Sequence, residues 1–440
     1  MWARVCGLQP FPQMEGFLPT RILKAVISLF LAVLVVWFLF AHEQAIRSNI
    51  KGRDSTLYWA TATLLMHGGN PYSIPDVLAL ERQVEYASEK TEKPKMYRPP
   101  PWSMWMILPL GFTSAYWAWV SWMALSMIAL VYGIRISWRL YGDGRTNPAL
   151  IFLLPAYLFA PVAACLVLAQ MGTILLLSIA LFFFLAEKRP LLAGAALLPA
   201  MAKPHFFAPL WVILIVWAVN RRKWLVLCGA SAAFLLANAI ALTFDHSIFR
   251  HYHDMLQLDD LQNEFMPNVS GMIRVLFFLH HFWVQFVPAA LGMAGCILYY
   301  WRNRETWDWR AHGPWLLIIG ALVAPYSWLT DEVALLPAVL QGVVWLSSAK
   351  LRVRSQLAIL VFVCFDLLLL LIVRAKVDPF TGIYFWSSLV WFSWYWYASS
   401  FREKSSVEEC EPPLPRQQAL PLHLTKRLGF GDARQRWHSP

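Results

Sequence analysis

Apolar runs close to the length of a membrane crossing recur along nearly the whole chain. A helix needs ~20 apolar residues to cross a bilayer, and inside lipid only helices or closed barrels satisfy every backbone polar group. We therefore expect an all-α polytopic membrane protein, with one bundle over residues 1–400. The runs predict twelve spans, at about 22–41, 115–134, 149–167, 172–186, 190–202, 205–219, 224–243, 283–301, 314–328, 332–348, 356–373 and 380–399.

Composition supports this class and excludes others. Of the 440 residues 58% are hydrophobic and only 14% are charged. The net charge of +11 does not indicate a nucleic-acid partner, because Lys and Arg lie in short clusters between the apolar runs, where membrane orientation explains them. The six cysteines show no C-x-x-C or zinc spacing, so we expect no metal ion, other cofactor or disulfide framework.

The basic clusters also predict orientation. The first run is longer than the ~7–15 residues of a signal-peptide core and follows basic residues, so we expect an uncleaved helix with a cytoplasmic N-terminus. With twelve spans the inner connections then hold fourteen basic residues, as positive-inside loops should. They are Arg135, Arg139, Arg145, Lys188, Arg189, Arg221, Arg222, Lys223, Arg302, Arg304, Arg310, Lys350, Arg352 and Arg354. The protein is expected in the plasma (inner) membrane, with a Pro-rich, disordered cytoplasmic tail over 401–440.

Polar sequence gathers on the opposite, outer side, which faces the periplasm or exterior. The first outer loop, 42–110, is the longest polar segment, and its charged spacer, 74–95, has no assigned role. Two short apolar pieces, Trp102–Leu110 and Val269–Leu279, are predicted to lie in or dip into the outer interface. Because irregular backbone at membrane depth must be covered by protein or line a polar cavity, they suggest a cavity on this side.

Asp54 is the first candidate residue. It precedes a helix-compatible segment that ends at Gly68-Gly69, so it could simply cap that helix. The functional alternative is a general base at the membrane surface. Tyr58 lies one turn further on the same helix face and could line the same site.

Lys203 and Arg98 are the candidate cations. Lys203 lies between two apolar runs, where an ammonium is costly unless it snorkels or binds a partner. No acid near it in sequence answers it, so a bound phosphate is the favoured partner. Arg98 precedes three prolines that could aim it at a phosphate, although a lipid-headgroup contact is equally compatible.

The other outer polar residues allow two interpretations each. Gln170, near a break between short runs, could bond another helix or a sugar hydroxyl. Asp331 and Glu332 begin a run and could cap it or shape a site. A group of histidines and aspartates could hold a metal ion, but it lacks a recognised metal spacing: His251, His253, Asp254, Asp259 and Asp260.

An ordered set of short motifs resembles glycosyltransferase family 87. The set is Asp54…Tyr58…Gly68-x-Asn70-Pro71-Tyr72, Tyr97-x-Pro99-Pro100, Gln170-x-Gly172, Lys203-Pro204 and Pro325-Tyr326-Ser327-Trp328. The resemblance implies a GT-C-type bundle and a polyprenyl-phosphate-mannose donor, with a catalytic Asp near the end of the first helix, where Asp54 falls. Such proteins often carry a His beside an Asp after Pro-Tyr-Ser-Trp; this chain has Leu329-Thr330-Asp331-Glu332, so no histidine role is carried over.

The resulting hypothesis is an inverting, membrane-embedded glycosyltransferase. It would move a hexose, mannose by resemblance, from a polyprenyl phosphate to a glycolipid or glycan acceptor on the outer side of the membrane. Asp54 would be the base, Lys203 and Arg98 would hold the phosphate, and the sugar site would be shaped by Tyr58, Asn70, Tyr72, Gln170 and Asp331. A transporter or flippase of a lipid-linked sugar is the alternative; it predicts polar sites at the bilayer centre and related halves, and the sequence indicates neither.

Overall fold

Prolines, glycines and basic clusters divide the apolar sequence into helices, the only regular elements among the residues that the structure describes. This computed structural model describes residues 53–84, 96–142, 155–258, 266–348, 352–375 and 386–402, with Tyr384 and a few positions between 33 and 43. The α-helices are α3 (Asp54–Met66), α4 (Ile74–Gln83), α5 (Ala115–Tyr141), α7 (Ala160–Leu168), α8 (Gly172–Leu185), α9 (Pro190–Ala196), α10 (Ala208–Asn220), α11 (Trp224–Phe244), α12 (Ile248–Leu258), α13 (Val269–Phe277), α14 (Val287–Asn303), α15 (Trp309–Val323), α16 (Leu336–Ser348), α17 (Arg352–Arg374) and α18 (Trp386–Ser399). Short 3₁₀ helices are η1 (Pro101–Met106), η2 (Leu108–Phe112), η3 (Pro199–Ala202), η4 (Phe282–Phe286), η5 (Arg304–Thr306) and η6 (Leu329–Leu335).

The all-helical membrane class is confirmed for the described residues. Five stretches are long and apolar enough to cross a membrane by length and composition: Ala115–Tyr141, Trp224–Phe244, Phe282–Thr306, Leu329–Ser347 and Val353–Arg374. Four shorter apolar helices accompany them: Pro155–Leu168, Gly172–Leu185, Pro190–Ala202 and Ala208–Asn220. The count of twelve spans and the GT-C arrangement stay predictions. Most of the first predicted span and the tail 403–440 lie outside the described residues.

Small residues set the closest helix contact. A Cβ on Gly194 of α9 would overlap the carbonyl oxygen of Val226 in α11, and a Cβ on Gly229 of α11 would overlap that of Leu191 in α9. This reciprocal glycine contact lets the two backbones touch, which is a common way to associate helices in lipid, where apolar burial gives little drive.

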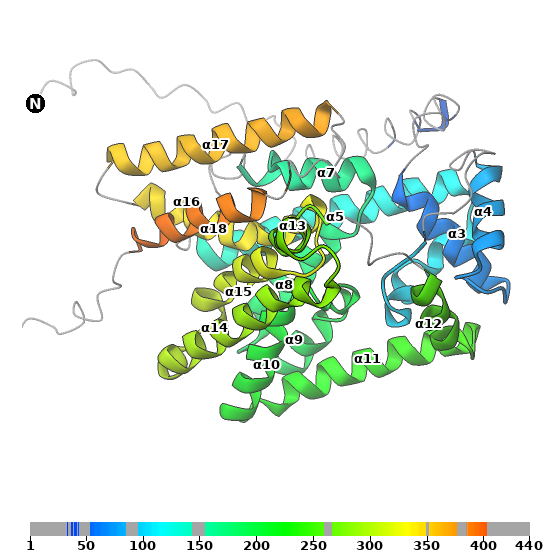
Figure 1. Ribbon diagram of the computed structural model, residues 1–440, viewed down its shortest axis with the longest axis horizontal. Coiled ribbons are helices and arrows are strands. Elements are labelled where there is room, and N and C mark those ends of the chain that lie inside the picture. The colour runs from blue at the N-terminus through cyan, green and yellow to red at the C-terminus, as the bar shows by residue number, and fades with distance from the viewer. Residues whose placement is uncertain are drawn as a thin grey trace, which may run out of the picture. The chain divides into compact units, whose positions relative to one another are not determined.

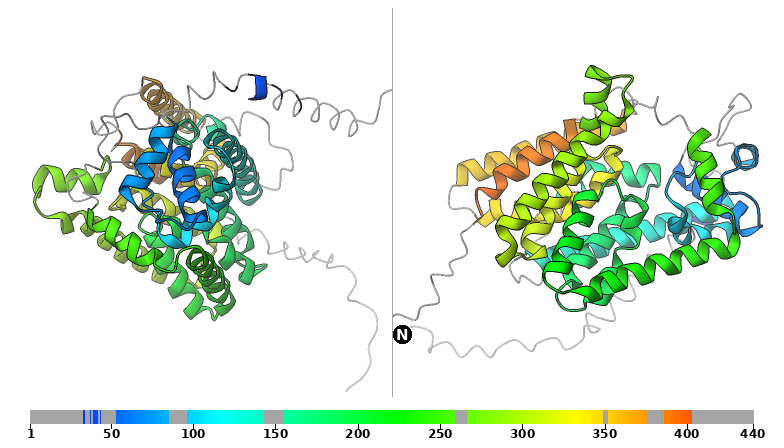
Figure 2. Two further views of the ribbon diagram at one scale, coloured as in Figure 1. Left: turned by 90° about the vertical axis from the view of Figure 1, so that its right-hand side faces the viewer. Right: turned by 60° about the horizontal axis from the view of Figure 1, so that its bottom comes forward.

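The helices around the predicted outer polar segments lie at one end of the described bundle. Figure 1 shows α3, α4 and α12 at that end, and α16, α17 and α18 toward the other. Figure 2 shows the long helix α11 running from beside α10 toward α12, at the end that also holds α3 and α4. The 3₁₀ helix η6 packs against α7 and α8, which brings its polar first turn into the bundle.

The two predicted interfacial pieces fold differently. Trp102–Leu110 forms η1 and η2 instead of one interfacial helix, because Pro100, Pro101 and Pro109 remove backbone donors and favour tight turns. These turns are buried against neighbouring helices, and Trp102 Nε1 donates to the Met201 carbonyl at 2.9 Å. The second piece forms α13 as predicted, with Phe277 71% exposed.

The charged spacer contains structure that the sequence analysis did not assign. Its first part forms α4, and residues 85–95 lie outside the described residues. Helix α4 packs on α3 through Val77 and Leu78, both buried. The first part of the spacer therefore supports the helix that carries Asp54.

Candidate functional site

Asp54 occupies the first turn of α3, one position after the N-cap. The N-cap residue is Arg53, whose own side chain makes no cap hydrogen bond. The Asp54 carboxylate instead accepts a hydrogen bond from Nε2 of Gln170, which lies more than a hundred residues away in sequence. The helix ends as predicted: Gly68 takes a left-handed φ of +73°, which glycine adopts without a steric cost. Asp54 therefore follows the N-cap position instead of occupying it, and its carboxylate reaches another helix.

A strained turn between α7 and α8 delivers Gln170. Ala169 closes α7 with a left-handed φ of +56°, a conformation that costs a non-glycine residue ~1–2 kcal/mol. The surrounding bundle holds it there, since Trp122 Nε1 donates to the Ala169 carbonyl at 2.8 Å and the Cys165 thiol donates to the Gln170 carbonyl at 3.2 Å. The predicted bond of Gln170 to another helix is therefore present, and its contact with a sugar hydroxyl stays a prediction.

Tyr58 joins the same cluster. Its hydroxyl donates to Oε1 of Gln170 at 3.3 Å, so the two ends of one amide engage Asp54 and Tyr58. Burial, and then the nearby Asp54 charge, raises the pKa of Tyr58 well above its ordinary value, which keeps the phenol protonated as a donor. The predicted shared face of Asp54 and Tyr58 is thus present.

Lys203 has a protein partner that sequence proximity did not reveal. Its ammonium forms an ion pair with Oδ1 of Asp331, whose side chain is 1% exposed. Asp331 Oδ2 also accepts from the Trp328 backbone amide at 3.1 Å, so this carboxylate caps η6 and binds the lysine. Burial lowers the pKa of Lys203, but Asp331 outweighs burial and the pKa lies above its ordinary value. No acid near Lys203 in sequence pairs with it, but the fold brings Asp331 to it from 128 residues away, and its contact with a phosphate stays a prediction.

Arg98 binds the same segment that carries Asp331. One terminal guanidinium nitrogen donates to the Tyr326 hydroxyl at 3.1 Å. The Arg98 carbonyl accepts from the Tyr252 hydroxyl of α12 at 3.0 Å, which fixes its backbone. Tyr252 was missed by the sequence analysis, since nothing in the amphipathic α12 segment distinguishes this tyrosine from a packing residue.

The two clusters are neighbours across Gly172. A Cβ at Gly172 would overlap the carbonyl oxygen of Thr330, the residue before Asp331. Only glycine allows the start of α8, two residues after Gln170, to press on η6 in this way. The Asp54–Gln170 contact and the Lys203–Asp331 pair therefore belong to one site, although no direct bond between the two clusters is described.

His205 also faces this site and was not singled out from the sequence. Its ring packs edge-to-face on Tyr326, with centroids 5.5 Å apart, and within the described residues its buried Nε2 has no hydrogen-bond partner. Burial and the Lys203 charge lower the pKa of His205 to about 4, so the imidazole is neutral at physiological pH. The Lys203-Pro204 motif was the signal that could have pointed to it.

Asn70 and Tyr72 are placed beside this site rather than in it. The Asn70 side chain accepts a hydrogen bond from the Tyr72 backbone amide at 2.9 Å, which closes a local turn. A contact between Asn70 and a sugar stays a prediction. Tyr72 is 4% exposed and packs its ring on Tyr252 at 5.4 Å. Its hydroxyl has no hydrogen-bond partner among the described residues.

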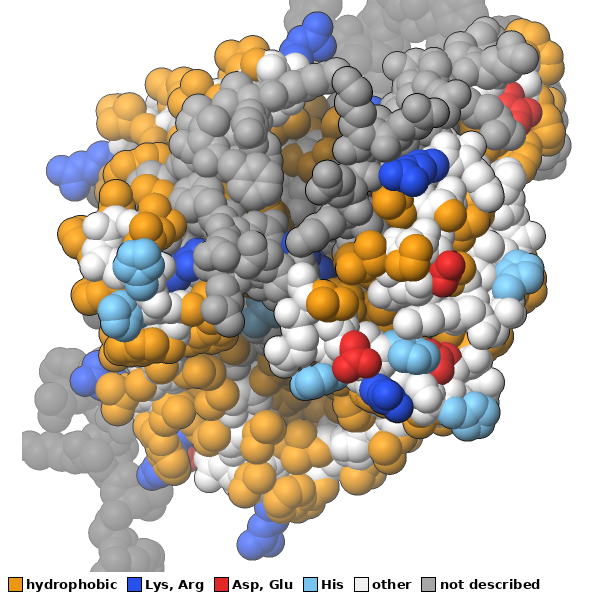
Figure 3. Space-filling view, turned by 45° about the vertical axis from the view of Figure 1, so that its right-hand side comes forward, with side chains coloured by type: hydrophobic (Ala, Val, Ile, Leu, Met, Phe, Trp, Pro, Cys, Tyr) orange, Lys and Arg blue, Asp and Glu red, His pale blue; other side chains and the backbone are white. Residues whose placement is uncertain are grey.

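The surface of this end of the bundle carries the described histidines and aspartates of α12 and of the residues just before it. Figure 3 shows charged and histidine side chains gathered there on a surface that is otherwise mostly apolar or neutral. His251 bonds Asp245 at 2.7 Å, while Asp259 and Asp260 lie outside the described residues. The described residues hold no grouping of three or more potential metal ligands, and metal independence stays a prediction.

Comparison with known proteins gives one match. No curated protein and no solved structure matches the chain significantly. The profile of glycosyltransferase family 87 matches residues 97–348, more than half of the chain. The matched range contains Arg98, Gln170, Lys203 and Asp331, and begins after Asp54. This chain, whose described part is helical and carries candidate membrane spans, belongs to glycosyltransferase family 87.

Proposed function

We propose that this protein transfers a hexose, mannose in the first instance, from a polyprenyl-phosphate donor to a glycolipid or glycan hydroxyl on the outer side of the plasma membrane. Family membership supports the transferase class. The observation that carries the finer proposal is the meeting of Asp54 and Gln170 beside the Lys203–Asp331 pair. This meeting joins a candidate base to candidate phosphate ligands within one site.

The residues suit transfer from a lipid phosphate. The acceptor oxygen attacks the anomeric carbon, the bond from that carbon to the phosphate oxygen breaks, and Asp54 takes the acceptor proton. The phosphate leaves as an anion and needs no general acid, so one carboxylate is enough. A single displacement inverts the anomeric centre, by analogy with glycoside hydrolysis, and a β-linked donor would give an α-linked product.

The two candidate phosphate ligands, Lys203 and Arg98, differ in burial and in their contacts. Asp331 already neutralises Lys203, so the pair presents little net charge to a phosphate. Arg98 is less buried, and its guanidinium reaches Tyr326, three residues before Leu329 and the start of η6. We assign the direct contact with the phosphate to Arg98 because it is the less buried of the two cations, with Lys203 fixing the Asp331 side of the site.

Replacing the proposed base tests this function. Membranes that contain Asp54→Asn should transfer label from radiolabelled polyprenyl-phosphate mannose at least ~100-fold more slowly, since a general base contributes ~10²–10⁴-fold. The matched control is Asp76→Asn, an exposed acid in the first turn of α4, which should keep its activity. Full transfer activity in a folded Asp54→Asn protein would refute the base assignment.

The same donor separates the transferase from a flippase. Purified protein in liposomes should form a new labelled glycoside with an added acceptor extract. Movement of the donor across the bilayer without a new glycosidic bond would overturn the proposal in favour of transport.

A further inference from the structure

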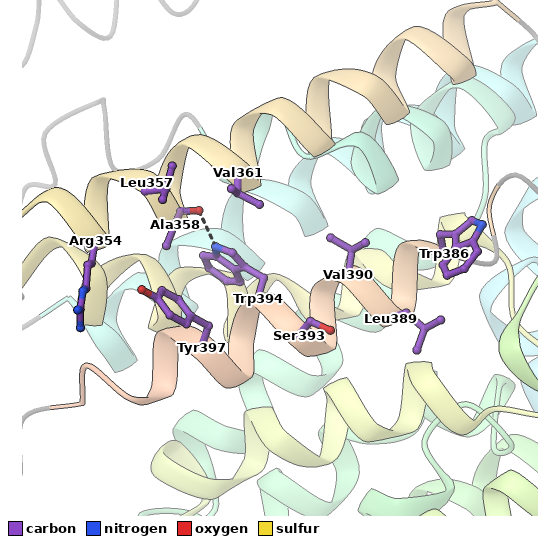
Figure 4. A pocket seen from close by; sticks show the side chains of 10 residues that line it. All are labelled: Arg354, Leu357, Ala358, Val361, Trp386, Leu389, Val390, Ser393, Trp394 and Tyr397. Atoms are coloured by element: carbon purple, nitrogen blue, oxygen red, sulfur yellow. Dashed lines mark hydrogen bonds between the residues drawn. The ribbon is translucent and has the colours of Figure 1, made fainter.

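An apolar groove runs between α17 and α18, on the opposite side of α18 from the candidate site. It encloses a cavity of about 690 Å³, within the ~300–1,000 Å³ typical of ligand pockets. Figure 4 shows the two helices side by side and diverging along the groove, with Arg354 and Tyr397 at one end and Trp386 at the other. Trp394 closes the floor, where its Nε1 donates to the Ala358 carbonyl at 3.0 Å.

The walls of the groove face the bilayer. Leu357 and Val361 on α17 are 58% and 51% exposed, and Trp386 on α18 is 55% exposed. These side chains belong to or border a helix that is long and apolar enough to span the membrane. Exposed apolar surface on such a helix contacts hydrocarbon, so a lipid chain is the occupant that matches the walls.

One end of the groove is polar and cationic. Arg354 lines it together with Tyr397, which offers a hydroxyl group, while Ser393 lies nearer the middle of the groove. Within the described part of the chain, Arg354 has no carboxylate in ion-pair distance. A planar guanidinium binds phosphate oxygens in a forked geometry, and hydroxyls add further donors. An anionic headgroup therefore fits this end, while the described residues at the opposite end, Trp386 and Leu389, are aromatic and apolar.

Groove length limits the kind of lipid. From Trp386 to Tyr397 the wall of α18 covers twelve residues, and the eleven steps between them span about 16 Å at ~1.5 Å per residue. This is roughly half of the ~30 Å hydrocarbon core, which is the depth of one leaflet. The groove thus matches a bilayer phospholipid better than a polyprenyl chain that extends beyond one leaflet.

We propose that the groove between α17 and α18 binds an anionic phospholipid, with its phosphate on Arg354 and one acyl chain along Leu357, Val361 and Val390. Arg354 belongs to the predicted inner basic cluster, so the lipid comes from the cytoplasmic leaflet, where anionic lipids and juxtamembrane cations attract each other. This site goes beyond the proposed transfer reaction and does not depend on it.

Lipid titration of the full chain tests the site. Purified protein in detergent is titrated with phosphatidylglycerol, with phosphatidylcholine of the same acyl chains, and with a polyprenyl phosphate, and bound lipid is counted by native mass spectrometry. Phosphatidylglycerol should bind most tightly, and Arg354→Gln should weaken it at least about fivefold, the effect of ~1 kcal/mol for one basic contact. Arg374→Gln, at the other end of the same helix, is the matched control and should change nothing.

A second variant examines the apolar walls. Val390→Trp fills the groove without touching Arg354 and should abolish the tight phosphatidylglycerol site while the protein keeps its melting temperature. If neither variant alters phosphatidylglycerol binding, the bound lipid is ordinary lipid around the bundle and the proposal is overturned. Tighter binding of the polyprenyl phosphate, lost in Val390→Trp, would overturn the assignment to a phospholipid.

Discussion

The buried Lys203–Asp331 pair allows a quantitative prediction. Asp331 is 1% exposed, so Lys203→Met leaves a buried carboxylate without its counter-charge and should cost about 3–5 kcal/mol of unfolding free energy. Asp331→Asn leaves the ammonium in the same position and should cost a similar amount. The double variant leaves neither charge, so its loss should fall short of the sum by about 2–3 kcal/mol.

The assay is a double-mutant cycle on detergent-solubilised protein, with unfolding followed by tryptophan fluorescence. The control cycle uses Lys223 and Glu187, a second lysine–carboxylate pair at 2.8 Å whose side chains are 36% and 52% exposed. That pair should show a coupling of about 0.2–1 kcal/mol. Equal coupling in the two cycles would refute the reasoning, because it would mean that burial adds nothing to the Lys203–Asp331 interaction.

Three further predictions concern the surroundings of the site. Ala169→Gly should retain activity and gain up to ~1 kcal/mol of stability, because glycine adopts the left-handed turn freely. Ala169→Val should instead displace Gln170 and reduce the transfer rate. Equal transfer rates in the two variants would contradict this prediction. The His205 pKa is about 4 in the folded state against 6.5 for an unfolded histidine. The unfolding free energy should therefore be highest above pH 6.5 and fall by about 3 kcal/mol as the pH drops toward 4. Thermal melting of His205→Gln at a series of pH values should lack this decrease. Trp391→Phe removes the donor that binds Glu332 Oε2 at 2.9 Å and should lower the unfolding free energy, measured with a chemical denaturant, by ~1–3 kcal/mol. A loss below ~0.5 kcal/mol would show that the hydrogen bond from Ser387 alone satisfies the carboxylate.

Local signals in the sequence predicted the helices well. Apolar runs and their basic or proline-rich boundaries reproduce α5, α8 and α11 closely, because membrane crossing imposes length and apolarity on each segment separately. The stop at Gly68 was likewise readable, since a left-handed residue after a helix favours glycine.

Pairing across the fold was less accessible. The motifs grouped Gln170 and Asp54 as members of one site but did not predict that the two side chains bond each other. They also did not predict that Asp331 pairs with Lys203. Such partners are set by how helices cross, which a periodic pattern does not encode. Tyr252 illustrates the same limit, because its bond to the Arg98 backbone depends on where α12 folds back.

The position of α18 has a practical consequence for anyone who shortens this protein. Glu332 lies within the range matched by the family, yet its two carboxylate oxygens are bound by Ser387 at 2.5 Å and Trp391 at 2.9 Å, both beyond residue 348. A chain cut at the end of the family match would leave that acid buried and without these two donors, next to Asp331. The smallest expression fragment that keeps the site intact should therefore extend through Ser399, and the working boundary of the enzyme lies some fifty residues beyond the boundary that sequence similarity draws.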